Sequence, residues 1–224
     1  MNNLKKISII FCLALLMGFV SCNEDDEPGL PIVDEYGICL TQEVNLGLPS
    51  GTIWAAWNVG ASSPEQYGGY YAWGEIEEKS SYDKYSYKYY NRQTGYCTYI
   101  GTNISGTQYD VARRRWGGSW RMPTKLEFDE LTTMCTWKWY QYKGVNGYKI
   151  TGPNGNSIFL PAAGTCDGTS LSYDGICGYC WSASLYDDGH GYGYGAWYLG
   201  FNDIIYGNRD YCSRAYGHTV RPVK

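Results

Sequence analysis

The sequence predicts one α+β domain with short strands, one clear helix and long loops. Two observations predict this class. Short runs of β-branched and aromatic residues recur between turns rich in Gly, Asn and Pro, whereas only two segments carry the signals of a helix start. Few helices among many short strands are typical of an α+β domain.

The chain begins with a predicted signal peptide over residues 1–21. Lys5 and Lys6 precede an apolar run over residues 7–19, which is too short to span a bilayer core, since that requires about 20 apolar helical residues. Ser21 and Cys22 follow this run and resemble the lipobox of bacterial lipoproteins. The resemblance implies cleavage before Cys22, lipidation of Cys22 and a lipid anchor in a membrane. The alternative is an ordinary signal peptide with an incidental cysteine.

Residues 22–35 are predicted to be an acidic tether between the anchor and the domain. Four acids stand in a row at residues 24–27, and Pro28, Gly29 and Pro31 follow, a composition typical of a solvated, disordered segment. Such an acidic cluster resembles the export signal that sends lipoproteins of the Bacteroidetes to the outer leaflet of the outer membrane. It implies a chain that faces the cell exterior; a spacer facing the periplasm is the alternative.

The charge of the remaining chain argues against nucleic acid as a partner. Without residues 1–21, which hold two Lys and no acid, the chain has 16 basic and 22 acidic residues and a formal net charge of −6. Nucleic-acid affinity depends on neutralisation of phosphates by Lys and Arg. The length after residue 21 is enough for one well-buried domain, expected over residues 36–224.

The cysteines do not predict a disulfide framework. Seven remain beyond Cys22, an odd number that leaves at least one unpaired, and they are scattered along the chain. Cys177 and Cys180 have C-x-x-C spacing, but no second pair accompanies them for zinc, and the following residues 181–184 are typical of a strand rather than a helix. We therefore expect no metal and no redox role for this pair.

Strands and loops are expected in the first half of the domain. Residues 44–51 and 52–59 predict two strands around a Pro-Ser-Gly turn, with one face of the second strand in the core. Residues 67–99 are rich in tyrosine and irregular. They form either a strand pair or a long structured loop.

Helix signals follow, and then a hairpin. Thr124 and Glu127 form a predicted capping box, and Phe128, Leu131 and Cys135 then fall on one helical face. A shorter helix is expected to start at Asp110 and to cover residues 111–116. Residues 147–152 and 157–161 flank an Asn-Gly turn and predict a hairpin.

Six sequence motifs cover residues 45–54, 58–61, 71–75, 116–124, 154–164 and 220–223. Together they resemble the Fibrobacter succinogenes major paralogous domain, which is abundant in lipoproteins of gut Bacteroidetes. The resemblance extends from about Val44 to the end of the chain. A second block, residues 121–128, is similar to the formylglycine-generating and sulfatase-modifying group, and this similarity implies a C-type-lectin-like fold. It does not imply their chemistry, because the chain has no counterpart of that group's reactive cysteine pair.

A skewed composition marks residues 179–216 as a recognition surface. This segment holds eight Tyr, six Gly and six Asp or Asn, but no Lys, Glu, Gln, Met, Thr, Val or Pro. Tyr gives large, stiff contact area and Gly, Ser and Asn give adaptable hydrogen bonds, as in antibody paratopes. The segment also resembles the mutable C-terminal region of variable proteins of diversity-generating retroelements, which implies variation at these positions. A fixed Tyr- and Gly-rich loop region is the alternative.

The predicted site consists of exposed tyrosines and of polar side chains in this segment. Contact area is expected from Tyr186, Tyr192, Tyr194, Tyr206 and Tyr211. Polar specificity is expected from Asp187, Asp188, His190, Asn202, Asp203, Asn208 and Asp210. Four apolar residues of the segment are expected in the core instead: Trp181, Trp197, Leu199 and Phe201.

The sequence favours binding over chemistry. His190 lies between glycines and His218 lies beside Val220, so neither is expected to serve as a general base, and no two carboxylates are paired by the sequence. Asn202 and Asp203 loosely resemble part of the calcium site of C-type lectins, but the partner motif is missing, so we expect no metal and no cofactor. The expected function is binding of an extracellular glycan or surface protein. The alternatives are a structural or adhesin component of a cell-surface assembly and, less favoured, an enzyme related to sulfatase-modifying proteins.

Overall fold

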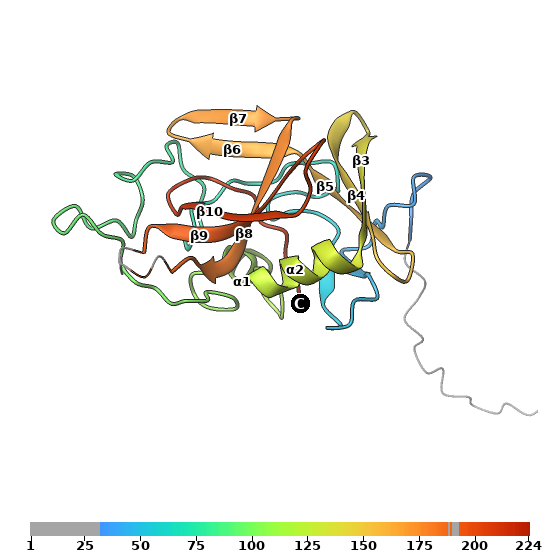
Figure 1. Ribbon diagram of the computed structural model, residues 1–224, viewed down its shortest axis with the longest axis horizontal. Helices are drawn as coiled ribbons and strands as arrows, with labels where there is room; N and C mark the ends of the chain where they lie inside the picture. The colour runs from blue at the N-terminus through green and yellow to red at the C-terminus, as the bar shows by residue number, and fades with distance from the viewer. Residues whose placement is uncertain (1–31, 188, 190–192) are drawn as a thin grey trace, which may run out of the picture. The chain divides into compact units, whose positions relative to one another are not determined.

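Three β-sheets and two short helices form the part of the chain that the structure describes (Figure 1). The computed structural model describes residues 32–187, 189 and 193–224. The predicted α+β class is confirmed, whereas the predicted signal peptide, Cys22 and most of the tether lie outside the described residues. The strands are β1 (Glu43–Asn45), β2 (Ile53–Ala55), β3 (Thr136–Tyr142), β4 (Val145–Thr151), β5 (Ser157–Pro161), β6 (Ala163–Asp167), β7 (Ser170–Asp174), β8 (Cys177–Leu185), β9 (Gly195–Asn202) and β10 (Asn208–Ser213); the helices are α1 (Val111–Trp116) and α2 (Lys125–Met134).

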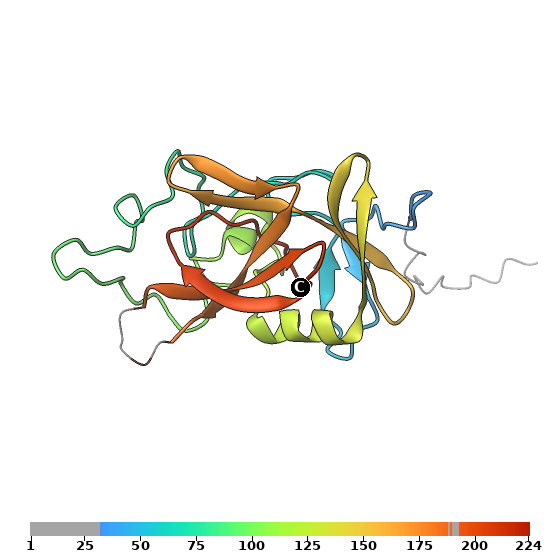
Figure 2. The ribbon, with the colours of Figure 1, turned by 45° about the horizontal axis from the view of Figure 1, so that its top comes forward.

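The largest sheet contains the predicted recognition segment. Its five strands lie in the order β10-β9-β8-β6-β7, and β8, β9 and β10 pair antiparallel over most of their length. β6 runs parallel to β8 through a single register pair, Gly164 with Gly178. Because this contact is so short, β6 and β7 diverge from the other strands and the sheet curls, as Figure 1 and Figure 2 show.

The two smaller sheets confirm the strand pairs predicted from turn chemistry. β4 and β5 form the predicted hairpin, in which Gly155 has a positive φ of 87° and Asn154 Oδ1 accepts a hydrogen bond of 3.1 Å from Asn156 N. β3 pairs with the other edge of β4. β1 and β2 pair antiparallel, and the turn between them closes through a 2.9 Å bond from Gly51 N to Leu48 O.

Both helices start where their caps predict. Asp110 accepts a 3.0 Å bond from Arg113 N at the start of α1, and Thr124 and Glu127 form the predicted capping box of α2. α2 ends at Met134, however, so the prediction that Cys135 belongs to its buried face was wrong: Cys135 has extended backbone dihedrals and leads directly into β3. Among the described residues, no helix is long and apolar enough to span a membrane.

The Tyr-rich residues 67–99 form a long structured loop, which decides between the two predicted alternatives. Outside the strands, this segment makes isolated bridges to distant segments, such as Tyr71 with His218 and Tyr82 with Gly168. Its tyrosine hydroxyls donate to backbone carbonyls, as Tyr87 Oη does to Trp73 O at 2.7 Å. Because a loop has few ladder bonds, these side chains satisfy backbone groups that burial would otherwise leave unpaired.

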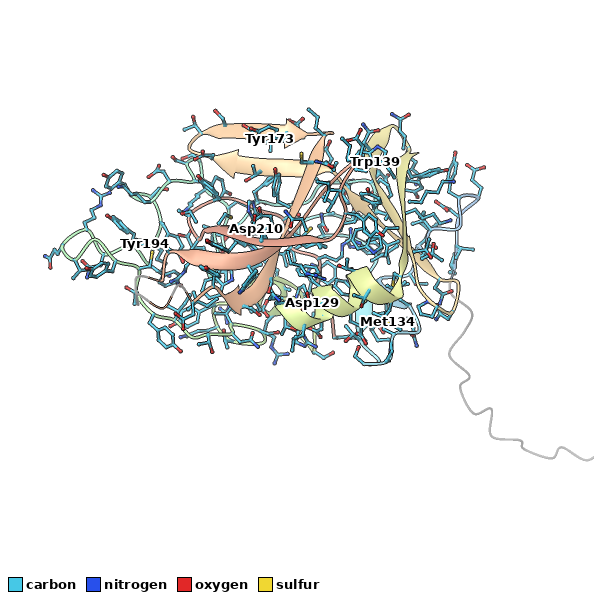
Figure 3. The ribbon with its side chains drawn as sticks, viewed as in Figure 1. Asp129, Met134, Trp139, Tyr173, Tyr194 and Asp210 are labelled. Atoms are coloured by element: carbon cyan, nitrogen blue, oxygen red, sulfur yellow. The ribbon has the colours of Figure 1, made fainter. Side chains whose placement is uncertain are left out.

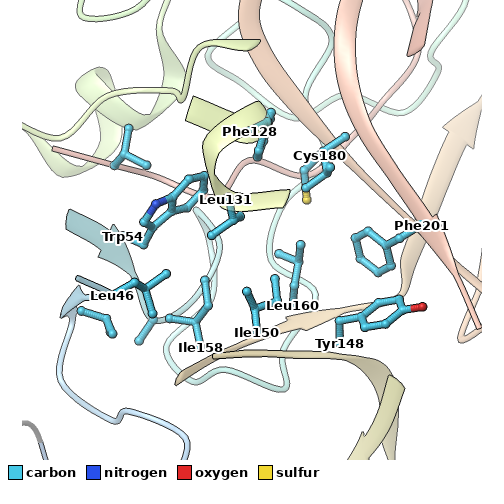
Figure 4. Close-up of a cluster of buried hydrophobic side chains, with 14 of the residues drawn as sticks. Leu46, Trp54, Phe128, Leu131, Tyr148, Ile150, Ile158, Leu160, Cys180 and Phe201 are labelled. Atoms are coloured by element: carbon cyan, nitrogen blue, oxygen red, sulfur yellow. The ribbon is translucent and has the colours of Figure 1, made fainter. Parts of the chain in front are cut away.

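The main core lies between α2, the β4–β5 hairpin and the middle of β8 and β9 (Figure 4). Phe128 of α2 packs on Trp54 of β2, with ring centroids 5.7 Å apart. A second buried cluster surrounds Trp181 of β8, whose Nε1 donates to Tyr71 O at 2.8 Å. The prediction of Trp181, Leu199 and Phe201 as core residues is confirmed.

A fully buried arginine joins the C-terminal segment to the rest of the domain. Arg221 Nε donates to Asn58 Oδ1 at 2.8 Å, Nη1 donates to Ala55 O at 3.0 Å and to Ala56 O at 2.7 Å, and Nη2 donates to Phe159 O at 2.8 Å. Burial lowers the pKa of Arg221 to about 10, so the side chain is still a cation at neutral pH. Each of the three side-chain nitrogens of Arg221 thus donates at least one hydrogen bond, and its charge is retained in the core.

Replacing Arg221 by Met should destabilise the domain strongly. The four acceptors would stay buried without their donor, and loss of one partner in a buried charged network costs about 3–5 kcal/mol. Urea unfolding at pH 7 would measure this loss. Arg113→Met, at an exposed position of α1, is the matched control and should change the free energy of unfolding by no more than about 0.5 kcal/mol. Equal losses in the two variants would contradict the role of Arg221.

Candidate ligand-binding site

Three aromatic rings pack together where β9 begins and β10 ends. Tyr186 and Tyr211 lie parallel, with an interplanar angle of 3° and centroids 3.4 Å apart, and Trp197 meets both rings edge to face at 5.3 Å and 6.0 Å. The strand register pairs Tyr211 with Trp197 across β9 and β10. We call Tyr186, Trp197 and Tyr211 the aromatic cluster.

The sheet and α2 hold the aromatic cluster in place. Lys125 Nζ of α2 lies 4.9 Å from the centre of the Trp197 ring, a cation–π contact. A Cβ at Gly195 would come within 3.2 Å of Tyr186 and 3.3 Å of Tyr211, so the absence of a side chain there makes room for the two stacked rings. Tyr211 keeps 46% of its surface exposed, which leaves a rigid aromatic face open to solvent.

Trp197 corrects one sequence prediction. The sequence predicts Trp197 as a core residue, but it is only half-buried and belongs to the aromatic cluster. Leu199, two residues further along β9, has the same orientation and is fully buried under α2. Trp197 differs because it lies near the start of α2, where it contacts the Lys125 side chain and the rings of Tyr186 and Tyr211.

A cavity of about 210 Å³ lies beside the aromatic cluster. Asp187 on its wall is exposed, and its Oδ1 accepts a 2.9 Å bond from Gly189 N. Tyr194 is 40% exposed and its hydroxyl donates to Gly95 O, which ties this region to the long Tyr-rich loop. The cavity is lined by Cys97, Tyr99, Thr102, Leu185, Tyr186, Asp187, Gly193 and Arg214.

A second group of predicted contact residues lies at the opposite end of β9. Asn202, Asp203, Tyr206 and Asn208 surround the β9–β10 turn, and β9 contains eight residues, which span about 25 Å at roughly 3.3 Å each. Figure 3 labels Tyr194 at the other end of the sheet. The predicted residues therefore form two separate surfaces rather than one.

The turn residues also have structural roles. Asn202 Oδ1 accepts bonds from Ile204 N at 2.9 Å and Ile205 N at 2.8 Å, so this amide shapes the turn. Tyr206 stacks on Trp137 of β3 at 5.6 Å and 18°. Asp203 is exposed beside them.

Asp210 lies between the two surfaces, on exposed strand β10 (Figure 3). Its Oδ1 accepts a 2.8 Å bond from Tyr211 N, and it lies opposite Tyr198 in the strand register. Burial, with a contribution from Asp210, raises the pKa of the Tyr198 hydroxyl. Three further predicted site residues, Asp188, His190 and Tyr192, lie outside the described residues.

The structure brings together a Cys–His pair that the sequence did not predict. Cys212 Sγ of β10 lies 3.1 Å from His218 Nε2, and His218 Nδ1 lies 3.0 Å from Thr165 Oγ1. The Tyr179 ring stacks on the imidazole at 5.3 Å. No spacing motif joins these residues in the sequence, because β6 and β10 meet at His218 only through the tertiary fold.

The environment of this pair favours two neutral groups. Burial lowers the pKa of His218 to about 3 and raises the pKa of the Cys212 thiol. A nucleophilic Cys–His pair requires the opposite shifts, which stabilise thiolate and imidazolium. The prediction that His218 belongs to the framework agrees with its 2% exposure.

Metal ligands do not converge in the described part of the chain. No group of three or more His, Cys, Asp or Glu side chains there could hold a metal ion. All seven cysteines beyond Cys22 are free thiols.

Comparison of this chain with models of protein families, with curated proteins and with solved structures gives no match. The family suggested by the sequence motifs therefore remains a prediction.

Acid should destabilise the domain through His218. Its folded-state pKa of about 3 lies below the ordinary 6.5, so the unfolded chain binds the additional proton and stability is lost as the pH falls from 6.5 toward 3. One such group contributes a slope of about 1.4 kcal/mol per pH unit. Urea unfolding between pH 6.5 and 5, above the range of most carboxylates, should show this slope.

Two histidine variants test the assignment. His218→Gln should remove the slope, whereas His190→Gln, which changes the other of the chain's two histidines, should retain it. A slope that disappears only in His190→Gln would contradict the role of His218.

Proposed function

We propose that this chain is a lipid-anchored lipoprotein of the outer membrane, facing the cell exterior, which binds an extracellular ligand through the aromatic cluster and the cavity beside it. The observation that supports this proposal best is the rigid, solvent-open stack of Tyr186 and Tyr211 next to the exposed carboxylate of Asp187. A glycan or a surface protein is the expected ligand.

A glycan suits this arrangement particularly well. Flat aromatic faces pack against the apolar face of a sugar ring, while a carboxylate accepts hydrogen bonds from its hydroxyls. Tyr and Trp have few rotatable bonds, so holding them in place costs little conformational entropy on binding. Binding of this kind requires neither a metal nor a cofactor, and we propose recognition rather than catalysis.

We further propose a C-type-lectin-like fold for residues 36–224. The supporting observations are the α+β arrangement with a curled sheet and the locked helix start at residues 121–127. There Arg121 Nη2 lies 2.5 Å from Glu127 Oε1, a structural role for the block that resembles sulfatase-modifying proteins. The binding loops would then lie on a rigid sheet, as is common in binding proteins.

Variation of the C-terminal segment is a separate proposal. Residues 208–211 of β10 are exposed, while Trp181 and Leu199 of the same sheet are fully buried, so changes on β10 would leave the core intact. Sequencing the 3′ end of the gene across a population of the host strain tests this idea. Substitutions concentrated at adenine-bearing codons for residues 179–215 would support diversification, and an invariant segment would contradict it.

An apolar surface at the β9–β10 turn favours a second candidate, a structural or adhesin component. Ile204 is 82% exposed, Ile205 is 55% exposed and Tyr206 is 49% exposed, and such adjacent apolar side chains are typical of protein contacts. Co-purification in a stoichiometric assembly that is lost in an Ile204→Asp, Ile205→Asp double variant would support this function. Saturable binding by the isolated protein would favour the first.

Tyr211→Ala should weaken ligand binding without unfolding the protein. The substitution removes half of the stacked pair but lies at an exposed strand edge, so the melting temperature should change little. We expect at least tenfold weaker binding, which corresponds to about 1.4 kcal/mol, measured by glycan-array screening followed by titration calorimetry.

Two further variants calibrate this result. Trp181→Ala, which empties a fully buried site, should destabilise the domain by about 3–5 kcal/mol. Tyr206→Ala, in the other surface, should leave glycan binding unchanged. Equal loss of stability in Tyr211→Ala and Trp181→Ala would contradict the distinction between cluster and core.

A further inference from the structure

We propose that residues 32–40, an N-terminal hairpin of the domain, dock on the surface of the lipid bilayer and so fix the orientation of the domain. The partner is a lipid surface. This inference rests on the proposed lipid anchor at Cys22 and adds a contact that the anchor alone does not require. Its basis is an apolar surface at the point where the chain enters the domain.

The hairpin is short and is bonded to the rest of the domain. Leu40 N donates to Ile32 O at 2.8 Å, and Val33 and Cys39 form the antiparallel bridge beside this bond. Cys39 is fully buried, and its N–H donates to Ser157 O of β5 at 2.9 Å. The hairpin therefore has a fixed place beside the β3–β4–β5 sheet.

The turn of the hairpin is held by Asp34. Its Oδ1 accepts bonds from Tyr36 N at 3.0 Å and Ile38 N at 2.9 Å, while Tyr142 Oη of β3 donates to its Oδ2 at 2.5 Å. Ile38 is fully buried in a cluster with Tyr142 and Phe159. A surface that is held in place before it meets its partner loses little conformational entropy on binding.

Four apolar side chains of this hairpin remain exposed. Ile32 is 66% exposed, Val33 is 49% exposed, Tyr36 is 41% exposed and Leu40 is 39% exposed. Grouped apolar side chains on a surface are typical of contacts with proteins or membranes. Aliphatic side chains enter the boundary between head groups and acyl chains, and tyrosine is enriched at the level of the head groups. The composition of the hairpin therefore fits a bilayer surface.

The charges around the hairpin balance. Lys149 Nζ of β4 donates to Tyr36 O at 2.5 Å, and Lys138 of β3, its partner in the strand register, is exposed. Asp34 and Glu35 of the hairpin carry the two opposing charges. Because these four formal charges cancel, burial of apolar surface rather than attraction to anionic lipid is expected to drive the contact. A zwitterionic bilayer should therefore be enough for docking.

The length of chain between the anchor and the hairpin favours lipid as the partner. Cys22 and Ile32 are ten positions apart, and an extended chain spans at most about 3.6 Å per residue. With the lipid on Cys22, Ile32 lies within about 36 Å of the bilayer. Such a short connection gives the hairpin a high effective concentration at the lipid surface, so a weak apolar contact is enough.

Docking through the hairpin directs the aromatic cluster away from the membrane. Figure 1 and Figure 2 both show the blue segment that begins with the hairpin beside β3 and β4. Figure 3 labels Tyr194, which directly precedes β9, at the opposite end of the domain, and the aromatic cluster lies where β9 begins. The contact would thus present the proposed binding surface to the medium.

Neutron reflectometry of the full-length, lipidated protein on a supported phosphatidylcholine bilayer tests the docking. The unaltered protein should form a layer directly on the head groups. An Ile32→Asp, Leu40→Asp double variant should stay anchored but move outward and leave a water layer of about 10–36 Å, the range that the ten-residue connection allows. Leu126→Asp, which changes a side chain 76% exposed on α2, is the matched control and should leave the layer in place.

The outcomes separate this inference from the proposed function. Loss of the unaltered protein from the bilayer on washing would contradict the lipid anchor and, with it, the docking. Retention of the protein above a water layer would overturn the docking alone. A double variant that no longer dimerises in sedimentation velocity but stays on the head groups would make the hairpin an interface between two copies and overturn the inference. Should the double variant fail to fold, the position of the unaltered protein decides.

Discussion

The buried network of Arg221 is the constraint on which the rest of the structure depends. This side chain joins the C-terminal segment to β2, to Asn58 and to β5 through four hydrogen bonds. Val223 in the same segment forms bridges to Trp54 of β2 and to Arg121, which precedes α2, so segments distant in sequence meet there. Arg221 donates from all three of its side-chain nitrogens, which offsets the cost of burying its charge. The core around Arg221 is therefore held together by directional hydrogen bonds as well as by apolar packing.

The aromatic cluster lies where the cover of α2 over the sheet ends. Leu199 is directed under α2, while Trp197 on the same face extends beyond full coverage by the helix and joins Tyr186 and Tyr211. The sheet is buried at its centre and exposed at its end, so the aromatic side chains at that end are held in place before any ligand binds. Such preorganisation limits the conformational entropy lost on binding. The position of the cluster at the sheet end thus follows from where helical cover stops.

The short distances around His218 are not enough to activate the Cys212 thiol as a nucleophile. Cys212, His218 and Thr165 have the distances of a catalytic group, but burial holds the imidazole and the thiol neutral and so opposes the charge separation that activates a thiol. Arg214 is also fully buried, where it donates to the carbonyls of Gly193 and Thr98 and packs on the Trp73 ring.

Local signals in the sequence determined much of the fold. The capping box at Thr124 and Glu127, the Asp110 cap and the Asn-Gly hairpin act within a few residues, so their structures could be predicted without knowledge of the rest of the chain. The composition of residues 179–216 likewise predicted tyrosines on an exposed surface. Tertiary structure alone decided that these residues form two surfaces about 25 Å apart, that Trp197 belongs to one of them, and that Arg214 is buried against Trp73 and Tyr87. The physical reason is that burial and hydrogen-bond pairing depend on partners far away in sequence, which neither spacing nor composition specifies.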